Sequence, residues 1–294
     1  MSAIDAGWRA AHPLPVHGAG TDKNSRGRVL LVGGAEFVPG ALRLTGEAVL
    51  RAGAGKLQMA TVSSAAMAVG VLVPEAAMIA LPGDGDGEIS ADAADRLGEA
   101  LESCDTLVLG PGMSCRVRTG ILLERLLAVP RADLTIVLDA AGVSCAHPLA
   151  ALIAAHDGRV VMTPHHGEMA ALSGLDVAAI AADPAAAAQE AARQFAAFIV
   201  LKGSDTVIAG PDGQRLDYGS DCVGLATGGS GDVLAGVVGG LLARGAPPLE
   251  AAGWGVWLHG EAGQAARRRI GEIGFLARDL LEEIPRLMTR GCAS

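Results

Sequence analysis

The chain has 294 residues, of which half are apolar and only 3% aromatic, and its formal net charge is −9. This apolar content excludes a disordered chain, and the negative balance argues against a protein that binds nucleic acid or anionic membranes through a broad basic surface. A small anionic ligand stays compatible with the charge, because backbone N–H groups can hold a phosphate without side-chain charge.

Short apolar runs alternate with longer runs rich in Ala and Leu along the chain. Such short runs are typical of strands buried on both faces of a parallel sheet. The expected strands are Arg28–Val32, Leu57–Thr61, Ala76–Leu81, Thr106–Leu109, Leu134–Leu138, Arg159–Thr163, Phe198–Leu201 and Thr206–Ala209. The expected helices are Ala41–Ala52, Ala91–Ser103, Thr119–Leu127, Pro148–Ala155, Pro184–Ala196, Asp232–Ala243, Leu249–Arg269 and Ala277–Leu287. This alternation predicts a three-layer α/β fold around a central, mostly parallel sheet.

No linker divides the chain, so we expect one domain over residues 1–294, with about residues 1–27 as an N-terminal extension. The first residues show no signal-peptide pattern, and no apolar window reaches the roughly 20 residues that span a bilayer. The five cysteines have no metal-binding spacing, which favours reduced thiols; they are Cys104, Cys115, Cys145, Cys222 and Cys292. We therefore expect a cytoplasmic protein.

The sharpest motif is the glycine-rich run Ala226–Gly236, which passes directly into an apolar helical pattern. A glycine-rich turn at a helix N-terminus exposes unpaired N–H groups and the positive end of the helix dipole, so it predicts a phosphate or oxyanion cradle. Asp232 falls in the first helical turn, where a carboxylate could act as a general base. The plainer alternative is that Asp232 only caps the helix.

Two common nucleotide-binding motifs are absent from the sequence. The run Ala226–Gly236 contains no Gly-Lys-Ser/Thr, so it is not a Walker A loop. After the first expected strand, Gly33, Gly34 and Gly40 have the wrong spacing for a dinucleotide-binding fingerprint.

Polar or glycine-rich turns follow the carboxyl ends of four expected strands: Gly110–Gly112, Asp139, Thr163–Glu168 and Lys202–Thr206. Ligands of open α/β sheets bind at this edge, so these turns and the glycine-rich run predict one cleft. Simpler interpretations remain open for each turn: His165 and Glu168 could form a surface pair or a helix cap, and Lys202 could extend from a strand end. The adjacent His165 and His166 lack a third ligand, so we expect no protein metal site.

Taken in order, the motifs resemble the ADP/ATP-dependent NAD(P)H-hydrate dehydratases, which have a ribokinase-like fold. The resemblance depends on Val29–Gly34, Pro39–Ala41, Arg51–Gly55, Leu109–Met113, Leu138–Ala140, Met162–Met169, Leu201–Gly203, Thr227–Gly236 and Leu258–Gly263. Members of this family often carry an additional epimerase domain, and here the resemblance implies the stand-alone dehydratase form.

The resemblance implies a lyase that repairs the S epimer of hydrated NADH or NADPH at the expense of ADP or ATP, with Mg²⁺. The stand-alone form favours ADP, and the family implies a homo-oligomer such as a tetramer. Asp232 would be the catalytic base. The substrate contacts implied by the matching motifs are Ala41, Gly112, His165 and Asp232. The implied nucleotide contacts are Lys202, Gly203, Ser204, Asp205, Thr206, Gly229, Ser230 and Gly231.

Two other functions share some of these features. A ribokinase-like kinase for a small molecule such as a vitamin precursor would use the same cradle and Asp232 but would stop at a phosphorylated product. A non-catalytic nucleotide-binding sensor would not need Asp232. The turns Gly110–Gly112 and Thr163–Glu168 together favour the dehydratase.

Overall fold

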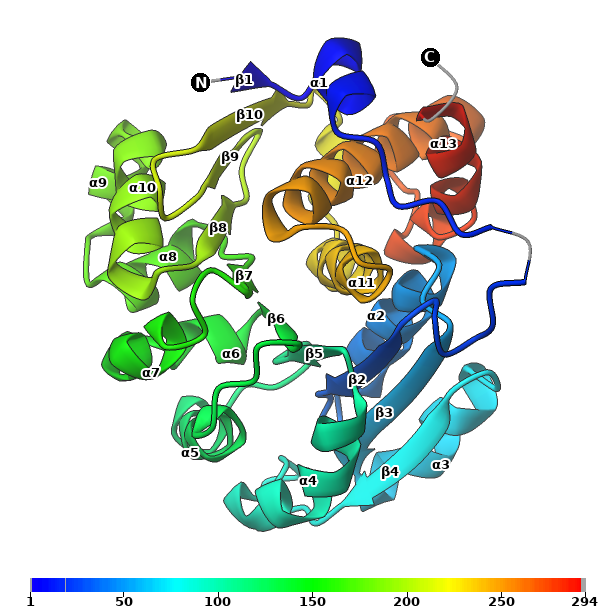
Figure 1. Cartoon of the computed structure of the whole chain (residues 1–294), viewed down its shortest axis with the longest axis vertical. Coiled ribbons are helices and arrows are strands. Elements are labelled where there is room, and N and C mark those ends of the chain that lie inside the picture. Colours follow the sequence, from blue (N-terminus) through cyan, green and yellow to red (C-terminus); the bar gives the residue numbers. More distant parts are fainter. Residues whose placement is uncertain (1, 19, 292–294) are drawn as a thin grey trace.

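The computed structural model describes residues 2–18 and 20–291, which fold around one continuous sheet (Figure 1). Its ten strands lie in the order β1-β10-β9-β8-β7-β6-β5-β2-β3-β4. Among the strands of these ranges, only β9 runs antiparallel to its neighbours. The strands are β1 (Ser2–Ala3), β2 (Arg28–Val32), β3 (Lys56–Val62), β4 (Ala77–Leu81), β5 (Thr106–Leu109), β6 (Thr135–Leu138), β7 (Val160–Met162), β8 (Phe198–Leu201), β9 (Asp205–Ala209) and β10 (Arg215–Gly219).

Helices cover both faces of the sheet and make the expected three layers (Figure 1). One layer contains α1 (Ala6–Ala11), α2 (Pro39–Arg51), α3 (Ser63–Leu72), α11 (Ser230–Ala243), α12 (Pro248–Ile270) and α13 (Glu283–Gly291). The other contains α4 (Ala94–Ser103), α5 (Arg116–Leu127), α6 (Ala141–Ser144), α7 (Ala150–Ala154), α8 (His166–Ser173), α9 (Val177–Ala182) and α10 (Pro184–Phe195). No helix in the described ranges is both long and apolar enough to cross a membrane.

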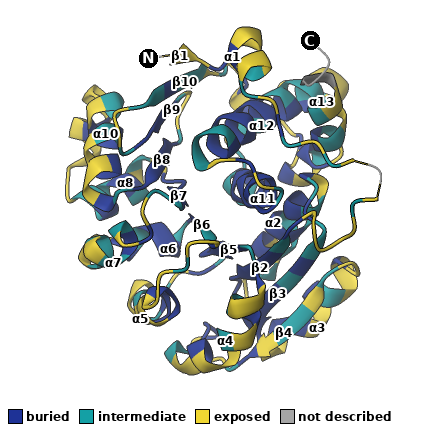
Figure 2. Cartoon of the chain, in the orientation of Figure 1, coloured by how far each residue is buried: buried dark blue, intermediate teal, exposed yellow. Residues whose placement is uncertain are grey.

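The sequence of β2 shows why the sheet must be covered on both sides. Successive side chains of a strand point to opposite faces, so Val29 and Leu31 enter one hydrophobic core while Leu30 and Val32 enter the other. All four side chains are buried. Figure 2 shows the same burial for the central strands and for α11 and α12.

The expected strands are confirmed to within a residue at each end, but two strands at the far edge were missed. In β10 only Leu216 is buried, because this strand lies near the sheet edge and contains polar residues on either side of Leu216. The strand β1 has only two residues and pairs with β10. Neither segment has the continuous apolar run that identifies a central strand.

The expectation of one continuous helix over Ala277–Leu287 is wrong. A 3₁₀ turn over Ala277–Leu280 is followed by α13, which begins at Glu283. Pro285 has no backbone N–H and is tolerated only in the first turn of a helix. The helix therefore has to begin again just before Pro285.

The helices α1, α3, α6, α8 and α9 were also absent from the expected set. The Ala-rich run over 178–192 is largely helical, and it is divided between α9 and α10 at Asp183. Asp183 accepts a hydrogen bond from the backbone N–H of Ala186 at 2.9 Å. A side chain that caps a new helix in this way also ends the preceding one.

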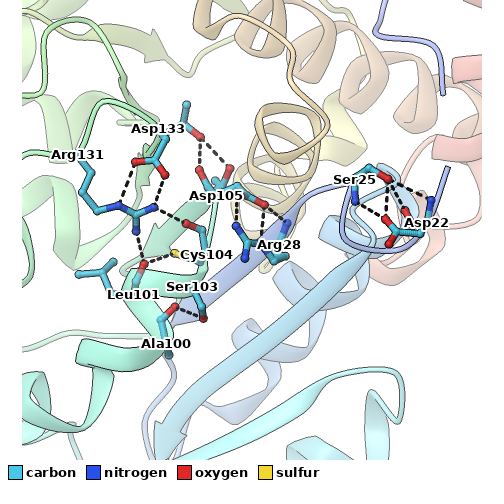
Figure 3. A network of polar contacts seen from close by, with 12 residues as sticks. Asp22, Ser25, Arg28, Ala100, Leu101, Ser103, Cys104, Asp105, Arg131 and Asp133 are labelled. Carbon is cyan, nitrogen blue, oxygen red and sulfur yellow. Dashed lines mark hydrogen bonds and ion pairs between the residues drawn. The ribbon is translucent and has the colours of Figure 1, made fainter.

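Charged pairs lie at the amino ends of the central strands (Figure 3). The Arg28 guanidinium, at the start of β2, binds Asp105 with an Nη2–Oδ1 distance of 2.6 Å. Nearby, Arg131 Nη2 lies 2.7 Å from Asp133 Oδ2. Arg28 and Arg131 each bind one carboxylate at this edge.

Candidate active site

The glycine-rich turn leads into α11, as the sequence predicts. The N-cap residue Gly229 has φ +89°, a left-handed conformation that favours glycine. Because Gly229 has no side chain, no side-chain oxygen caps the first-turn N–H groups of α11. Asp232 lies in this first turn and is not the N-cap. The geometry therefore leaves the N-terminal end of α11 free to hold an anion.

Lys202 lies beside this cradle. Its Nζ is 3.2 Å from the position that a Cβ on Gly231 would occupy. Lys202 follows β8 directly, and its backbone N–H donates to the carbonyl oxygen of Pro164 at 2.8 Å. This bond continues the β7–β8 pairing past the strand ends and brings the turn after β7 next to Lys202.

Two carboxylates share the Lys202 ammonium. Asp139 Oδ1 is 3.0 Å from Nζ, and Glu168 Oε2 is 3.6 Å away. Asp139 also accepts a hydrogen bond from Thr163 Oγ1 at 2.7 Å. With 4% of the Asp139 side chain and 20% of the Lys202 side chain exposed, this pair is largely shielded from water.

These charges and burial together raise the pKa values of both Asp232 and Lys202. Burial is the main cause that raises the pKa of Asp232 from 3.8 to about 7; Asp139 and Glu168 add to the rise, and Lys202 opposes it. Burial alone would lower the pKa of Lys202, but Asp139 and Glu168 outweigh it and hold that pKa above its ordinary value. A carboxyl group with a pKa near neutrality is suited to take up and release a proton.

His165 is the N-cap of α8 and not a metal-type ligand. Its Nδ1 accepts hydrogen bonds from the backbone N–H groups of Gly167 and Glu168 at 2.9 and 3.1 Å. Glu168 Oε2 accepts one from the His165 N–H at 2.8 Å, which completes a capping box. In the neutral ring the proton must then be on Nε2, since Nδ1 acts as acceptor. Nε2 lies 3.4 Å from Glu168 Oε1, and 59% of the His165 side chain is exposed, so the ring can also donate to a ligand.

Glycines allow three loops to meet at the same edge of the sheet. A Cβ on Gly110 would lie 1.9 Å from the carbonyl oxygen of Asp139, so only glycine fits there. The Gly34 N–H donates to the carbonyl oxygen of Pro111 at 2.7 Å. A Cβ on Gly112 would lie 2.9 Å from the Cβ of Ala41. Ala41 and Gly112, both expected substrate contacts, are therefore neighbours.

The remaining expected nucleotide residues lie in the turn after β8 and at the start of β9. Gly203, Ser204 and Asp205 are exposed, and Thr206 Oγ1 donates to the carbonyl oxygen of Gly203 at 3.3 Å. Gly203 also lies close to the ring of His166. Lys202 connects this exposed turn to the buried end of the site.

Mg²⁺ is implied by the family resemblance, so its fit to these residues can be tested. No three His, Cys, Asp or Glu side chains of the described ranges are grouped as a metal site. Mg²⁺ is commonly held by one or two carboxylates together with substrate phosphates and water. Asp139 and Glu168, side by side around Lys202, fit that arrangement.

Sequence reasoning named the turns that meet here but missed two partnerships. It did not assign Asp139 or Glu168 a role in the site, although Asp139 directly follows β6 and Glu168 lies in the first turn of α8. It also missed the contact between Ser230 and His259, whose Oγ and Nε2 atoms are 2.8 Å apart. The position of Asp139 after a buried strand was the available signal; nothing local indicated the His259 contact.

Comparison with known proteins matches residues 29–286 to the family described as NAD(P)H-hydrate dehydratase. An ADP-dependent (S)-NAD(P)H-hydrate dehydratase from Xanthomonas campestris pv. campestris is 46% identical over 99% of this chain and 97% of its own length. The chain also matches bifunctional NAD(P)H-hydrate repair enzymes, of which it spans about half.

Solved structures agree with this result. An ADP/ATP-dependent NAD(P)H-hydrate dehydratase from Bacillus subtilis, co-crystallised with ATP and Mg²⁺, superposes with a TM-score of 0.82 at 27% identity, covering 99% of this chain and 98% of that chain. A ribokinase-like superfamily protein from Enterococcus faecalis gives 0.86 at 23% identity, covering 100% and 97%, and supports the fold alone. The chain therefore has a ribokinase-like fold and belongs to the NAD(P)H-hydrate dehydratase family.

Proposed function

We propose that this protein dehydrates the S epimer of hydrated NADH or NADPH and uses ADP or ATP as phosphoryl donor. The observation that carries the proposal is Asp232, which combines a place at the open N-terminus of α11 with a pKa near 7. A protein that only bound nucleotides would not need a proton acceptor there. Family membership supports the substrate class.

Asp232 would take the proton from the ring hydroxyl of the hydrate, whose oxygen then attacks the terminal phosphoryl group of the nucleotide. The resulting phosphate is a far better leaving group than hydroxide. As the C–O bond breaks, the lone pair of the ring nitrogen assists, and loss of a neighbouring ring proton restores the dihydronicotinamide. General-base help of this kind contributes about 10² to 10⁴ in rate.

The charge that develops on the phosphoryl oxygens would be met by the cradle. Backbone N–H groups over Gly229–Gly231 and the Lys202 ammonium supply donors that need no reorganisation during the reaction. Bound with the nucleotide, Mg²⁺ would neutralise phosphate charge, and Asp139 and Glu168 are the residues placed to hold it. The turn over Lys202–Thr206 would hold the rest of the nucleotide. Ala41, Gly112 and His165 would contact the hydrate.

One assay tests the proposal. The protein is incubated with NADH hydrate, Mg²⁺ and either ADP or ATP, and the absorbance of the dihydronicotinamide is followed together with phosphate release. Recovery of absorbance with one phosphate per turnover is expected, and comparison of the two donors settles the preference for ADP. A stable phosphorylated product would instead indicate a kinase, and no reaction of any kind would indicate a sensor.

Self-association, such as a tetramer, also remains a prediction, and the surface of α3 supports it. Met67 and Val71 are 80% and 73% exposed and lie next to β4, an edge strand without charged residues. Exposed apolar surface beside an unpaired sheet edge promotes association. Light scattering should give a multiple of 29.5 kDa, and Val71→Lys should lower it. A monomeric mass for the unchanged protein would rule this out.

A single domain and a cytoplasmic location are further predictions. All ten strands belong to one continuous sheet, which supports a single domain. The thiols of Cys104, Cys115, Cys145 and Cys222 are free, which supports a reducing compartment; Cys292 lies outside the described residues. Cell fractionation with a tagged chain tests the location.

A further inference from the structure

We propose that His259 acts as a positioning residue that turns the hydroxyl proton of Ser230 toward the phosphoryl group in the cradle. Ser230 thereby becomes a side-chain donor in addition to the backbone N–H groups. This inference rests on the proposed function, because it assigns the hydroxyl to the same phosphoryl transfer.

The contact between Ser230 and His259 joins α11 to α12 at the N-terminal end of α11. Ser230 is the first residue of α11 and only 5% exposed. His259, on α12, places Nε2 at 2.8 Å from Ser230 Oγ and at 3.1 Å from the Ser230 carbonyl oxygen. One ring nitrogen thus faces both oxygen atoms of the same residue.

The carbonyl oxygen decides which ring nitrogen carries the proton. A carbonyl oxygen can only accept, so a bare Nε2 at 3.1 Å would set two lone pairs against each other. If Nε2 carries the proton, it can donate to the carbonyl oxygen and to Oγ at once. Burial, together with the positive charge of Lys202, lowers the pKa of His259 to about 4, although the Ser230 backbone bond opposes the fall. The ring is therefore neutral at physiological pH and has one N–H.

This arrangement leaves the hydroxyl proton of Ser230 without a protein acceptor. Its oxygen already accepts from Nε2, and within the described ranges Oγ has no hydrogen-bond partner other than His259. A buried donor without an acceptor is costly. Gly231 and Asp232 follow directly in the first turn of α11, and Lys202 Nζ lies against Gly231. An anionic phosphoryl oxygen held by this turn is the acceptor that the hydroxyl lacks.

The test is a double-mutant cycle of Ser230→Ala and His259→Phe, assayed with NADH hydrate and ADP. Loss of a preorganised donor to a developing anion costs about 10²- to 10³-fold in kcat, and we expect that for Ser230→Ala. If His259 acts through the hydroxyl, the double variant should be no slower than Ser230→Ala alone. KM for the hydrate should change little. If the kcat losses of the two single variants multiply in the double variant, the proposal is overturned.

Two further variants separate positioning from packing. His259→Gln keeps an N–H donor and should recover part of the kcat lost in His259→Phe. His156→Phe is the matched control, because His156 is also buried and bonded through Nε2 to a backbone carbonyl, that of Leu127, but lies outside the site. Its kcat should equal that of the unchanged protein. A kcat for His259→Gln as low as that of His259→Phe would contradict the positioning role.

A measurement that does not depend on turnover distinguishes this inference from the proposed function. Nitrogen-15 NMR of labelled histidine in the ligand-free protein should show His259 as the neutral Nε2–H tautomer from pH 5 to 8. A proton on Nδ1 would overturn the inference even if the enzyme is active. If the hydrate is not a substrate, the proposed function fails, but this inference can still be tested. The tautomer of His259 is one readout. The other is the ADP affinity of Ser230→Ala, which we expect to be about 2- to 10-fold lower than that of the unchanged protein.

Discussion

The two edges of the sheet use the same kinds of charged residues in opposite ways. At the amino ends of the strands, Arg28 and Asp105 form a pair whose side chains are 40% and 32% exposed (Figure 3). At the carboxyl ends, Lys202 is shared between Asp139 and Glu168 in a largely buried setting. We call the amino edge, where Arg28 and Arg131 each bind one carboxylate, the balanced edge. At the carboxyl edge, two carboxylates share one cation and are largely buried.

The pKa values show what this difference does. At the balanced edge, the hydrogen bond from Arg131 holds the pKa of Asp133 below its ordinary value. At the other edge, burial and the neighbouring carboxylates raise the pKa of Asp232 to about 7. A carboxyl group with a pKa near neutrality arises here because burial and two further carboxylates disfavour its charged form, and such shifted groups are typical of functional sites.

The largest effect on activity is expected from removing the Asp232 carboxylate. Asp232→Asn keeps the shape of the side chain but cannot accept the proton, so kcat should fall by about 10² to 10⁴. The nucleotide affinity should change little, because the cradle is made by backbone groups. Steady-state kinetics and calorimetry measure the two quantities. Turnover close to that of the unchanged protein would exclude Asp232 as the base.

The same variant should be more stable than the unchanged protein at alkaline pH. The folded pKa of Asp232, about 7, lies above its ordinary value of 3.8. The folded state therefore keeps a proton that the unfolded chain loses, and stability falls as pH rises from about 4 to 7. Above pH 7, Asp232→Asn should gain about 1–2 kcal/mol, after a discount for solvent screening.

Denaturant melts at pH 8 and pH 4 check this prediction. The gain should be present at pH 8 and should fade by pH 4, where both side chains are neutral. An equal difference at both pH values would mean that it does not come from the titration of Asp232.

A smaller effect should follow from weakening the acidic neighbourhood of Asp232. In the unchanged protein, kcat should fall about tenfold per pH unit below about pH 7, because the base becomes protonated. Asp139→Asn removes a charge that raises the pKa of Asp232, so this acid limb should move to lower pH. The matched control Asp105→Asn, at the balanced edge, should leave the limb in place. An unmoved limb in Asp139→Asn would count against the electrostatic link.

The smallest effect is expected at the balanced edge itself. Arg28→Met breaks an ion pair that is partly exposed, and such pairs contribute about 0–1 kcal/mol. Thermal unfolding should detect little change, and activity should equal that of the unchanged protein. A large loss of activity would show that the two edges are coupled across the sheet.

The central strands could be predicted from sequence because burial on both faces leaves a continuous apolar run, as in β2 and β5. Edge strands such as β10 lack that run. In the site, Asp232 and Lys202 were identified because each follows a local signal, a glycine-rich turn or a strand end. The Lys202–Asp139 pair joins residues 63 positions apart, and the His259–Ser230 contact spans 29 positions. Such contacts depend on how the layers pack, which local patterns do not contain.

The pairing of β1 with β10 has a consequence for the order in which the sheet folds. Ser2 lies opposite Leu216 and Ala3 opposite Asp217, so two segments that are far apart in the sequence pair with each other. Loop closure over such a separation is slow. We therefore expect β1 to pair with β10 only after most of the sheet has formed. Pulse-labelled hydrogen exchange during refolding should therefore find the amides of β1 protected after those of the central strands.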